Sequence, residues 1–171
     1  MHLKVLLLWI SFLFFSYCAM SQGRPERVKI DEHLNAMFPD HVQRIDSLGV
    51  TLFQTAVQRI TYQIVMKENI FQDGSNKDRN SLIEDAANII LNQPKFRNLA
   101  KMAKDSVVGG SSGKFIRMTG SNAAKPYRIF IFVTMRQRTM YSVQMTSFNT
   151  QEITDASAYY FFSHLEFHRP K

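Results

Sequence analysis

The stretch PYRIFIFVTMR, residues 126–136, decides the fold of this chain. Successive side chains of a β-strand alternate between its two faces, and here both faces are apolar, with Ile129, Ile131 and Val133 on one and Phe130 and Phe132 on the other. A strand that is apolar on both faces is usually buried on both. The stretch therefore predicts a central strand with a layer of structure on each side of its sheet.

Turns and further strands flank this stretch. Arg136–Thr139 predicts a turn into a last strand, whose apolar face is formed by Tyr141, Val143 and Met145. On the other side, the glycine-rich segment 109–113 predicts a flexible turn that leads into a strand over Lys114–Met118. Three consecutive strands are thus expected in the second half of the chain.

Shorter strands are predicted in the first half. Leu34, Ala36 and Phe38 share one face of a strand that Pro39 ends, and residues 41–45 form a second short extended run. The alternating segments 50–55 and 60–66 are expected to be neighbours in an antiparallel sheet, and residues 73–76 (DGSN) form a loop.

Helical spacing occurs at three places. The sequence Ser81-Leu82-Ile83-Glu84 has the form of a capping box and opens an apolar stripe that ends before Pro94. A second helix is predicted through Phe96, Leu99 and Ala103 as far as Ser106, and a third from Asp155 as N-cap, with an apolar stripe made of Ala158, Phe161, Phe162 and Leu165.

This order of elements predicts the fold class. Strands that occur in runs, instead of alternating singly with helices, favour an α+β fold with an antiparallel sheet. We expect a six- to seven-stranded sheet flanked by helices on both sides, an αβα sandwich, in a single domain over residues 32–168.

Residues 1–21 have the pattern of a secretory signal peptide. Lys4 precedes the apolar run VLLLWISFLFFSY, residues 5–17, and small residues follow at Ala19 and Ser21, so cleavage is expected after Ser21. An uncleaved anchor is the alternative, but the run is shorter than the roughly 20 residues of a membrane span. Cys18 would suit a lipoprotein anchor, although the bulky Tyr17 precedes it. We therefore predict a secreted or periplasmic protein without a stable membrane span, with residues 22–31 as a flexible lead-in.

The charge distribution points to an anionic partner. The full chain has a formal net charge of +7, and no Asp or Glu occurs from Ser106 to Gln151. The candidate binding residues are the basic side chains of this region: Lys114, Arg117, Lys125, Arg128, Arg136 and Arg138. They would form one patch on neighbouring strands and their hairpin turn, or else serve as solvated edge charges that deter aggregation. For an exported protein, an envelope protein or anionic polymer is the expected partner, and nucleic acid is not.

Motifs for catalysis are weak. The glycines before Lys114 do not match a phosphate-binding loop, because Val108 replaces its first glycine and Phe115 its Ser or Thr. His164, Glu166 and His168 would share one face of an extended chain and could then hold a divalent metal. His33 and His41 lie near acidic residues, but the sequence has no Gly-x-Ser-x-Gly motif and its one cysteine lies in the predicted signal.

Short phrases of the sequence resemble the PsbP/Mog1-like fold family. Ala36-Met37-Phe38-Pro39 is similar to its opening strand, and Met140–Val143 to its last strand. Residues 160–167 (YFFSHLEF) resemble the Phe-Phe-x-Ser-Phe-x-Phe close of secreted bacterial members of Bacteroidetes type. The resemblance covers about residues 30–167 and implies a sheet with helices on both sides. The family's named branches are adaptors, one for the oxygen-evolving photosystem and one for a nuclear transport GTPase.

These observations predict a non-enzymatic exported binding or accessory module without a cofactor. The alternative hypothesis is a divergent small hydrolase or metal-binding protein that uses His164, Glu166 and His168.

Overall fold

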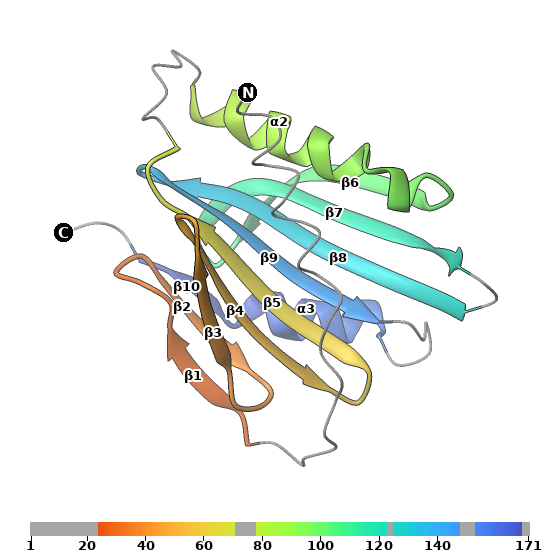
Figure 1. Cartoon of the computed structure of the whole chain (residues 1–171), viewed down its shortest axis with the longest axis horizontal. Helices are drawn as coiled ribbons and strands as arrows, with labels where there is room; N and C mark the ends of the chain where they lie inside the picture. Colours follow the sequence, from red (N-terminus) through yellow and green to blue (C-terminus); the bar gives the residue numbers. More distant parts are fainter. Residues whose placement is uncertain (1–23, 71–77, 123–124, 148–152, 169–171) are drawn as a thin grey trace.

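The computed structural model describes residues 24–70, 78–122, 125–147 and 153–168. They form a seven-stranded antiparallel sheet, a three-stranded sheet and two α-helices (Figure 1). The predicted signal peptide, residues 1–21, and the predicted loop 73–76 lie outside the described residues. Within those residues, none of the helices is long and apolar enough to cross a bilayer.

The large sheet confirms the predicted α+β class. Its strands, in spatial order, are β3 (Gln43–Ser47), β4 (Val50–Val57), β5 (Ile60–Lys67), β9 (Thr139–Ser147), β8 (Lys125–Arg136), β7 (Ser111–Asn122) and β6 (Ala100–Val108). Every neighbouring pair is antiparallel, including the predicted pair β4 and β5. Strand β8 lies in the interior of the sheet, as its two apolar faces predicted.

Strand β8 contributes to a separate core on each face. Ile129, Ile131 and Val133 pack with helix α2 (Arg79–Leu91) and with Ile116 and Met118 of β7. On the other face, Phe130 and Phe132 pack with helix α3 (Asp155–Ser163) and the three-stranded sheet. The helices therefore cover opposite faces of the sheet, as in the expected αβα arrangement (Figure 1).

Helix α2 begins two residues earlier than its predicted capping box. Asp78 is the N-cap, and its carboxylate accepts a hydrogen bond of 2.8 Å from the backbone N–H of Ser81. Ser81 therefore lies inside the helix, and its predicted capping role is wrong. An aspartate is as good an N-cap as a serine, and its position three residues before Ser81 lets it reach that free amide.

The helix predicted from Phe96 to Ser106 is also wrong. A 3₁₀ turn, η3 (Pro94–Phe96), leads instead into β6, which pairs along its whole length with β7. Gly109 and Gly110 have φ angles of 56° and 79°, which glycine adopts without strain, and they form the tight turn that returns the chain as β7. The backbone hydrogen bonds between β6 and β7 therefore decide the conformation of this segment, although three of its apolar residues have helical spacing.

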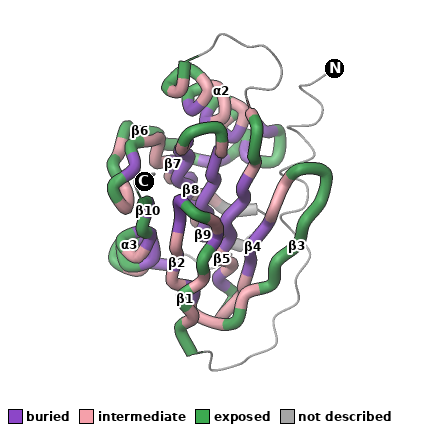
Figure 2. The backbone as a smooth tube through the Cα atoms, turned by 90° about the vertical axis from the view of Figure 1, so that its left-hand side faces the viewer, coloured by how far each residue is buried: buried purple, intermediate pink, exposed green. Residues whose placement is uncertain are grey.

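The lead-in and the C-terminus meet in the small sheet. The sequence predicts a flexible segment over residues 22–31, but β1 (Glu26–Lys29) pairs with β2 (Leu34–Phe38) (Figure 2). Ile30, which follows β1, is buried. Strand β10 (Leu165–Phe167) pairs with the other edge of β2. The predicted opening strand β2 is thus the centre of a separate sheet, and long-range pairing orders the polar segment before it.

The end of the last helix differs from the prediction in two ways. Thr154, and not Asp155, is the N-cap, because its hydroxyl oxygen accepts the backbone N–H of Ser157. Leu165 does not continue the helical stripe, because it belongs to β10. Its side chain is nevertheless buried in the same core as Phe161 and Phe162.

Candidate functional site

The predicted basic residues do not form one patch. Lys114 lies on the α2 face of the sheet, where its Nζ is 2.7 Å from Glu84 Oε2 and 3.1 Å from Asp105 Oδ1. The hydrogen bonds to Glu84 and then Asp105 raise the pKa of Lys114. Its charge is therefore engaged inside the protein, on the side of the sheet opposite to Arg117 and Arg128.

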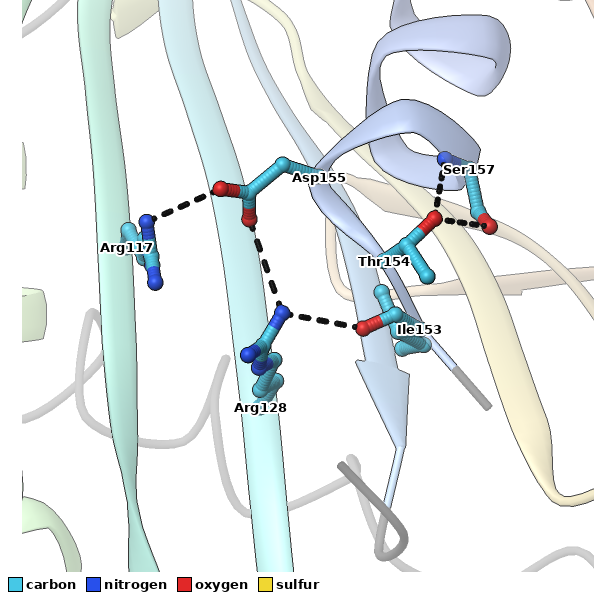
Figure 3. A network of polar contacts seen from close by, with 6 residues as sticks. All are labelled: Arg117, Arg128, Ile153, Thr154, Asp155 and Ser157. Atoms are coloured by element: carbon cyan, nitrogen blue, oxygen red, sulfur yellow. Dashed lines mark hydrogen bonds and ion pairs between the residues drawn. The ribbon is translucent and has the colours of Figure 1, made fainter. Parts of the chain in front are cut away.

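Arg117 and Arg128 come together at the start of α3 (Figure 3). Arg117 Nη1 lies 3.2 Å from Asp155 Oδ2, and Arg128 Nη1 lies 3.6 Å from Asp155 Oδ1. Arg128 Nη1 also donates to the carbonyl oxygen of Ile153 at 3.1 Å. Two guanidinium groups thus share one carboxylate, which leaves an excess of positive charge at this point.

The remaining basic residues lie apart from this pair. Arg136 donates to the carbonyl oxygen of Gly110 at 2.6 Å and lies over the Phe167 ring, 5.9 Å from its centroid. Arg138 is exposed in the β8–β9 turn. Lys125 opens β8 opposite Asn122, and its side chain is not among those described.

The histidine motif near the C-terminus does not gather into a metal site. Residues 165–167 are extended, as a metal site would need, but each side chain has a separate partner. His164 Nδ1 is 2.7 Å from the carbonyl oxygen of Tyr160, Glu166 pairs with Arg27, and His168 Nε2 is 2.8 Å from Asn35 Nδ2. The described residues contain no group of three or more acidic, histidine or cysteine side chains that could hold a metal ion.

His33 and His41 also have different neighbours. His33 is buried and lies 3.2 Å from Glu32, whereas His41 is exposed and lies 3.3 Å from Glu26. Asp31 is engaged by structural contacts, since it accepts the hydroxyl of Tyr141 and the backbone N–H groups of His33 and Leu34. Burial, followed by the bond to Asp31, raises the pKa of Tyr141. This network ties the N-terminal segment to β9.

A groove between β6 and α3 is the candidate site. Strand pairing builds its floor: Met102 of β6 lies opposite Arg117 of β7, and Lys104 lies opposite Phe115. Residues opposite each other in antiparallel strands project from the same face, so cationic and apolar side chains alternate across this floor. The hollow has a volume of about 560 Å³. We call it the β6–α3 groove.

Helix α3 supplies the other wall of the β6–α3 groove. Phe162 packs edge-on against Phe115 with ring centroids 5.1 Å apart, which fixes the floor to the helix. Tyr159, one helical turn before, lines the groove and is 76% exposed. Met102 of β6, on the other side of the groove, is 46% exposed. Uncovered apolar side chains thus gather on both walls of one hollow, which is typical of a binding surface.

Sequence reasoning found Arg117 but missed the rest of this groove. Met102, Lys104 and Ser106 alternate along β6 with their side chains toward the groove, yet they were assigned to a helix. The period of two in this segment was a usable signal, because Met102, Lys104, Ser106 and Val108 form one face of a strand.

Comparisons with known proteins show the fold. No protein-family model and no curated protein matches this chain. Cyanobacterial PsbP (CyanoP) from Synechocystis superposes with a TM-score of 0.53 at 10% sequence identity, over 91% of this chain and 99% of that protein. The chain has the PsbP-like α+β fold.

Two further solved structures share this PsbP-like fold. LpqN from Mycobacterium tuberculosis, described as involved in cell envelope biogenesis, has a TM-score of 0.50 at 11% identity, over 85% of this chain and 91% of LpqN. A Bacteroides thetaiotaomicron protein has a TM-score of 0.51 at 14% identity over 87% of this chain. This chain spans 50% of the Bacteroides protein. At these identities the likeness establishes the arrangement of the elements and no activity.

Proposed function

We propose that this protein is an exported, non-enzymatic binding module of the bacterial envelope and that it binds its partner in the β6–α3 groove. Export rests on the signal-peptide pattern of residues 1–21 and on the resemblance to secreted bacterial proteins of the PsbP/Mog1-like fold. The binding role rests on one observation above all: uncovered apolar side chains and two cations line the same hollow.

The groove is a better binding surface than the charged hairpin rim that the sequence suggested. Lys114 is paired with Glu84 and Asp105, Arg136 donates to the Gly110 carbonyl oxygen and lies over the Phe167 ring, and neither of them lines the groove. Arg117, by contrast, lines the hollow while sharing Asp155 with Arg128. The anionic partner expected from the charge of the chain would therefore meet Arg117 and Lys104.

Site-specific crosslinking tests this proposal. A photoreactive phenylalanine analogue replaces Tyr159 in the groove wall, and in a matched control it replaces Ile45, an exposed apolar residue of β3 at the opposite edge of the large sheet. Irradiation of cells that export the protein is expected to yield an adduct with an envelope component from position 159 and none from position 45. Equal adducts from both positions, or none from position 159, would contradict a groove-based binding function.

A further inference from the structure

We infer that the β6–α3 groove binds a fatty acid, with the carboxylate at Arg117 and Lys104 and the hydrocarbon chain against Met102, Phe115 and Tyr159. The inference deepens the proposed function, on which it rests, by naming the class of ligand. Three features of the groove carry it: its charge, the character of its walls and its size.

The charge of the groove favours a single anionic group. Lys104 and Arg117 lie on adjacent strands, and the register places each of them opposite an apolar residue, Phe115 and Met102. Arg117 and Arg128 share the carboxylate of Asp155, and each of them contacts it through Nη1 (Figure 3). Arg117 also lines the groove, and a guanidinium group has five N–H donors and can bind a carboxylate with two parallel bonds.

The walls favour a hydrocarbon chain over a sugar polymer. Beyond the two cations and Asp155, the lining is dominated by aromatic and aliphatic side chains, including Phe115, Tyr159 and Phe162. A polysaccharide presents many hydroxyl groups, each of which loses free energy if it is buried without a hydrogen bond. An alkyl chain has no such groups and gains free energy from every methylene that it buries.

The size favours a small molecule over a protein. A hollow of about 560 Å³ lies within the range of pockets that enclose small ligands. A stable protein partner covers on the order of 800 Å² on each side, which is a much broader and flatter surface than one groove. An acidic peptide is therefore the weaker occupant, and it enters the experiment as a competitor.

A fluorescence titration with purified mature protein tests the inference. The probe is dansyl-undecanoate. The competitors are octanoate, decanoate and dodecanoate, all below their micellar concentrations, and an acidic peptide. We expect saturable probe binding and displacement that strengthens by up to about fourfold for each methylene added, until the chain outgrows the groove. Dodecyltrimethylammonium, which has the same chain and a positive head, is expected to compete poorly.

Two variants connect this binding to the groove. Arg117→Gln is expected to weaken dodecanoate binding at least about tenfold, because a hydrogen bond to a charged group is lost. Lys104→Gln, on the exposed strand β6, should also weaken dodecanoate binding. This second variant tests the inference if the Arg117 variant fails to fold. Arg138→Gln, an exposed arginine of the β8–β9 turn, serves as the matched control and should bind as the unchanged protein does.

Several results would overturn the inference. These are the absence of saturable probe binding, equal affinity for dodecyltrimethylammonium, unchanged affinity in both groove variants, and displacement of the probe by an acidic peptide but not by dodecanoate. If dodecanoate does not bind while position 159 still yields a specific adduct, the fatty acid is refuted and the binding function stands. If both experiments fail, the proposed function fails as well.

Discussion

Replacing Tyr141 with phenylalanine removes one hydroxyl group from the interior and leaves the packing of the ring in place. The Tyr141 side chain is fully buried, and its ring lies edge-on to Phe167 with centroids 5.6 Å apart, a contact that phenylalanine keeps. The lost hydroxyl donates a hydrogen bond to Asp31 Oδ2. The other carboxylate oxygen, Oδ1, accepts the N–H groups of His33 and Leu34 at 2.8 Å each.

The expected loss of stability follows from the charge of the acceptor. A hydrogen bond to a charged group contributes about 1.5–3 kcal/mol to the free energy of unfolding. For a domain of about 150 residues, each kcal/mol changes the melting temperature by about 2–4 °C. We therefore expect Tyr141→Phe to lower the free energy of unfolding by about 1.5–3 kcal/mol. Tyr160→Phe, which changes an exposed tyrosine, should stay within about 0.5 kcal/mol of the unchanged protein.

The effect should also depend on pH. Burial and the bond to Asp31 raise the pKa of Tyr141 in the folded state, whereas a tyrosine of the unfolded chain ionises near pH 10. The contribution of this group is therefore complete below about pH 10 and is lost as the pH rises above that value. The difference in stability between the unchanged protein and Tyr141→Phe should shrink over the same range.

Urea denaturation followed by circular dichroism measures these differences at neutral pH and between about pH 9 and 11, on either side of the tyrosine pKa. If Tyr141→Phe unfolds at the same urea concentration as the unchanged protein, the hydroxyl does not stabilise the fold. The hydrogen bond between Tyr141 and Asp31 would then not hold the N-terminal segment to β9.

Two further predictions concern the backbone. Gly113→Ala should lower the free energy of unfolding by about 1–3 kcal/mol through overpacking, because the new Cβ would lie 2.2 Å from the Val133 carbonyl oxygen. A melting temperature equal to that of the unchanged protein would refute the close approach of β7 and β8. Asp78→Ala should lower the melting temperature by a few degrees while Asp78→Asn keeps it, because asparagine retains the capping oxygen. The hydrogen bond from the Ser81 N–H lowers the pKa of Asp78, so the stabilisation by the Asp78 cap is present above about pH 4 and disappears at lower pH. Equal melting curves for Asp78→Ala and Asp78→Asn would contradict the capping role.

Local pattern was sufficient where the elements follow it closely. The two apolar faces of Ile129–Val133 predicted an interior strand with cores on both sides, and the α+β class followed from the order of the runs. The strand over Leu34–Phe38 and the antiparallel pair β4 and β5 were also predicted from alternation alone. In these segments burial and secondary structure have the same period, so sequence spacing carries the information.

Local pattern failed where a distant partner decides the conformation. The segment after Phe96 has helical spacing, but pairing with β7 makes it a strand, and the polar segment Glu26–Lys29 is ordered because β2 offers it an edge. The candidate site was missed for the same reason. Only the register of β6 on β7 brings Lys104 beside Arg117, and only the packing of α3 adds Tyr159 to them.

The central strand Ile129–Val133 shows what the sequence by itself determined, because the alternation of apolar side chains on both faces is a local property that requires a covering layer on each side. What covers each face, and where the covering stops, was decided by the tertiary structure. Helix α3 packs on Phe115 through Phe162, and a hollow stays open between α3 and β6. The position of that hollow depends on contacts between residues more than forty positions apart, such as Phe115 and Phe162, and no spacing within one segment encodes them.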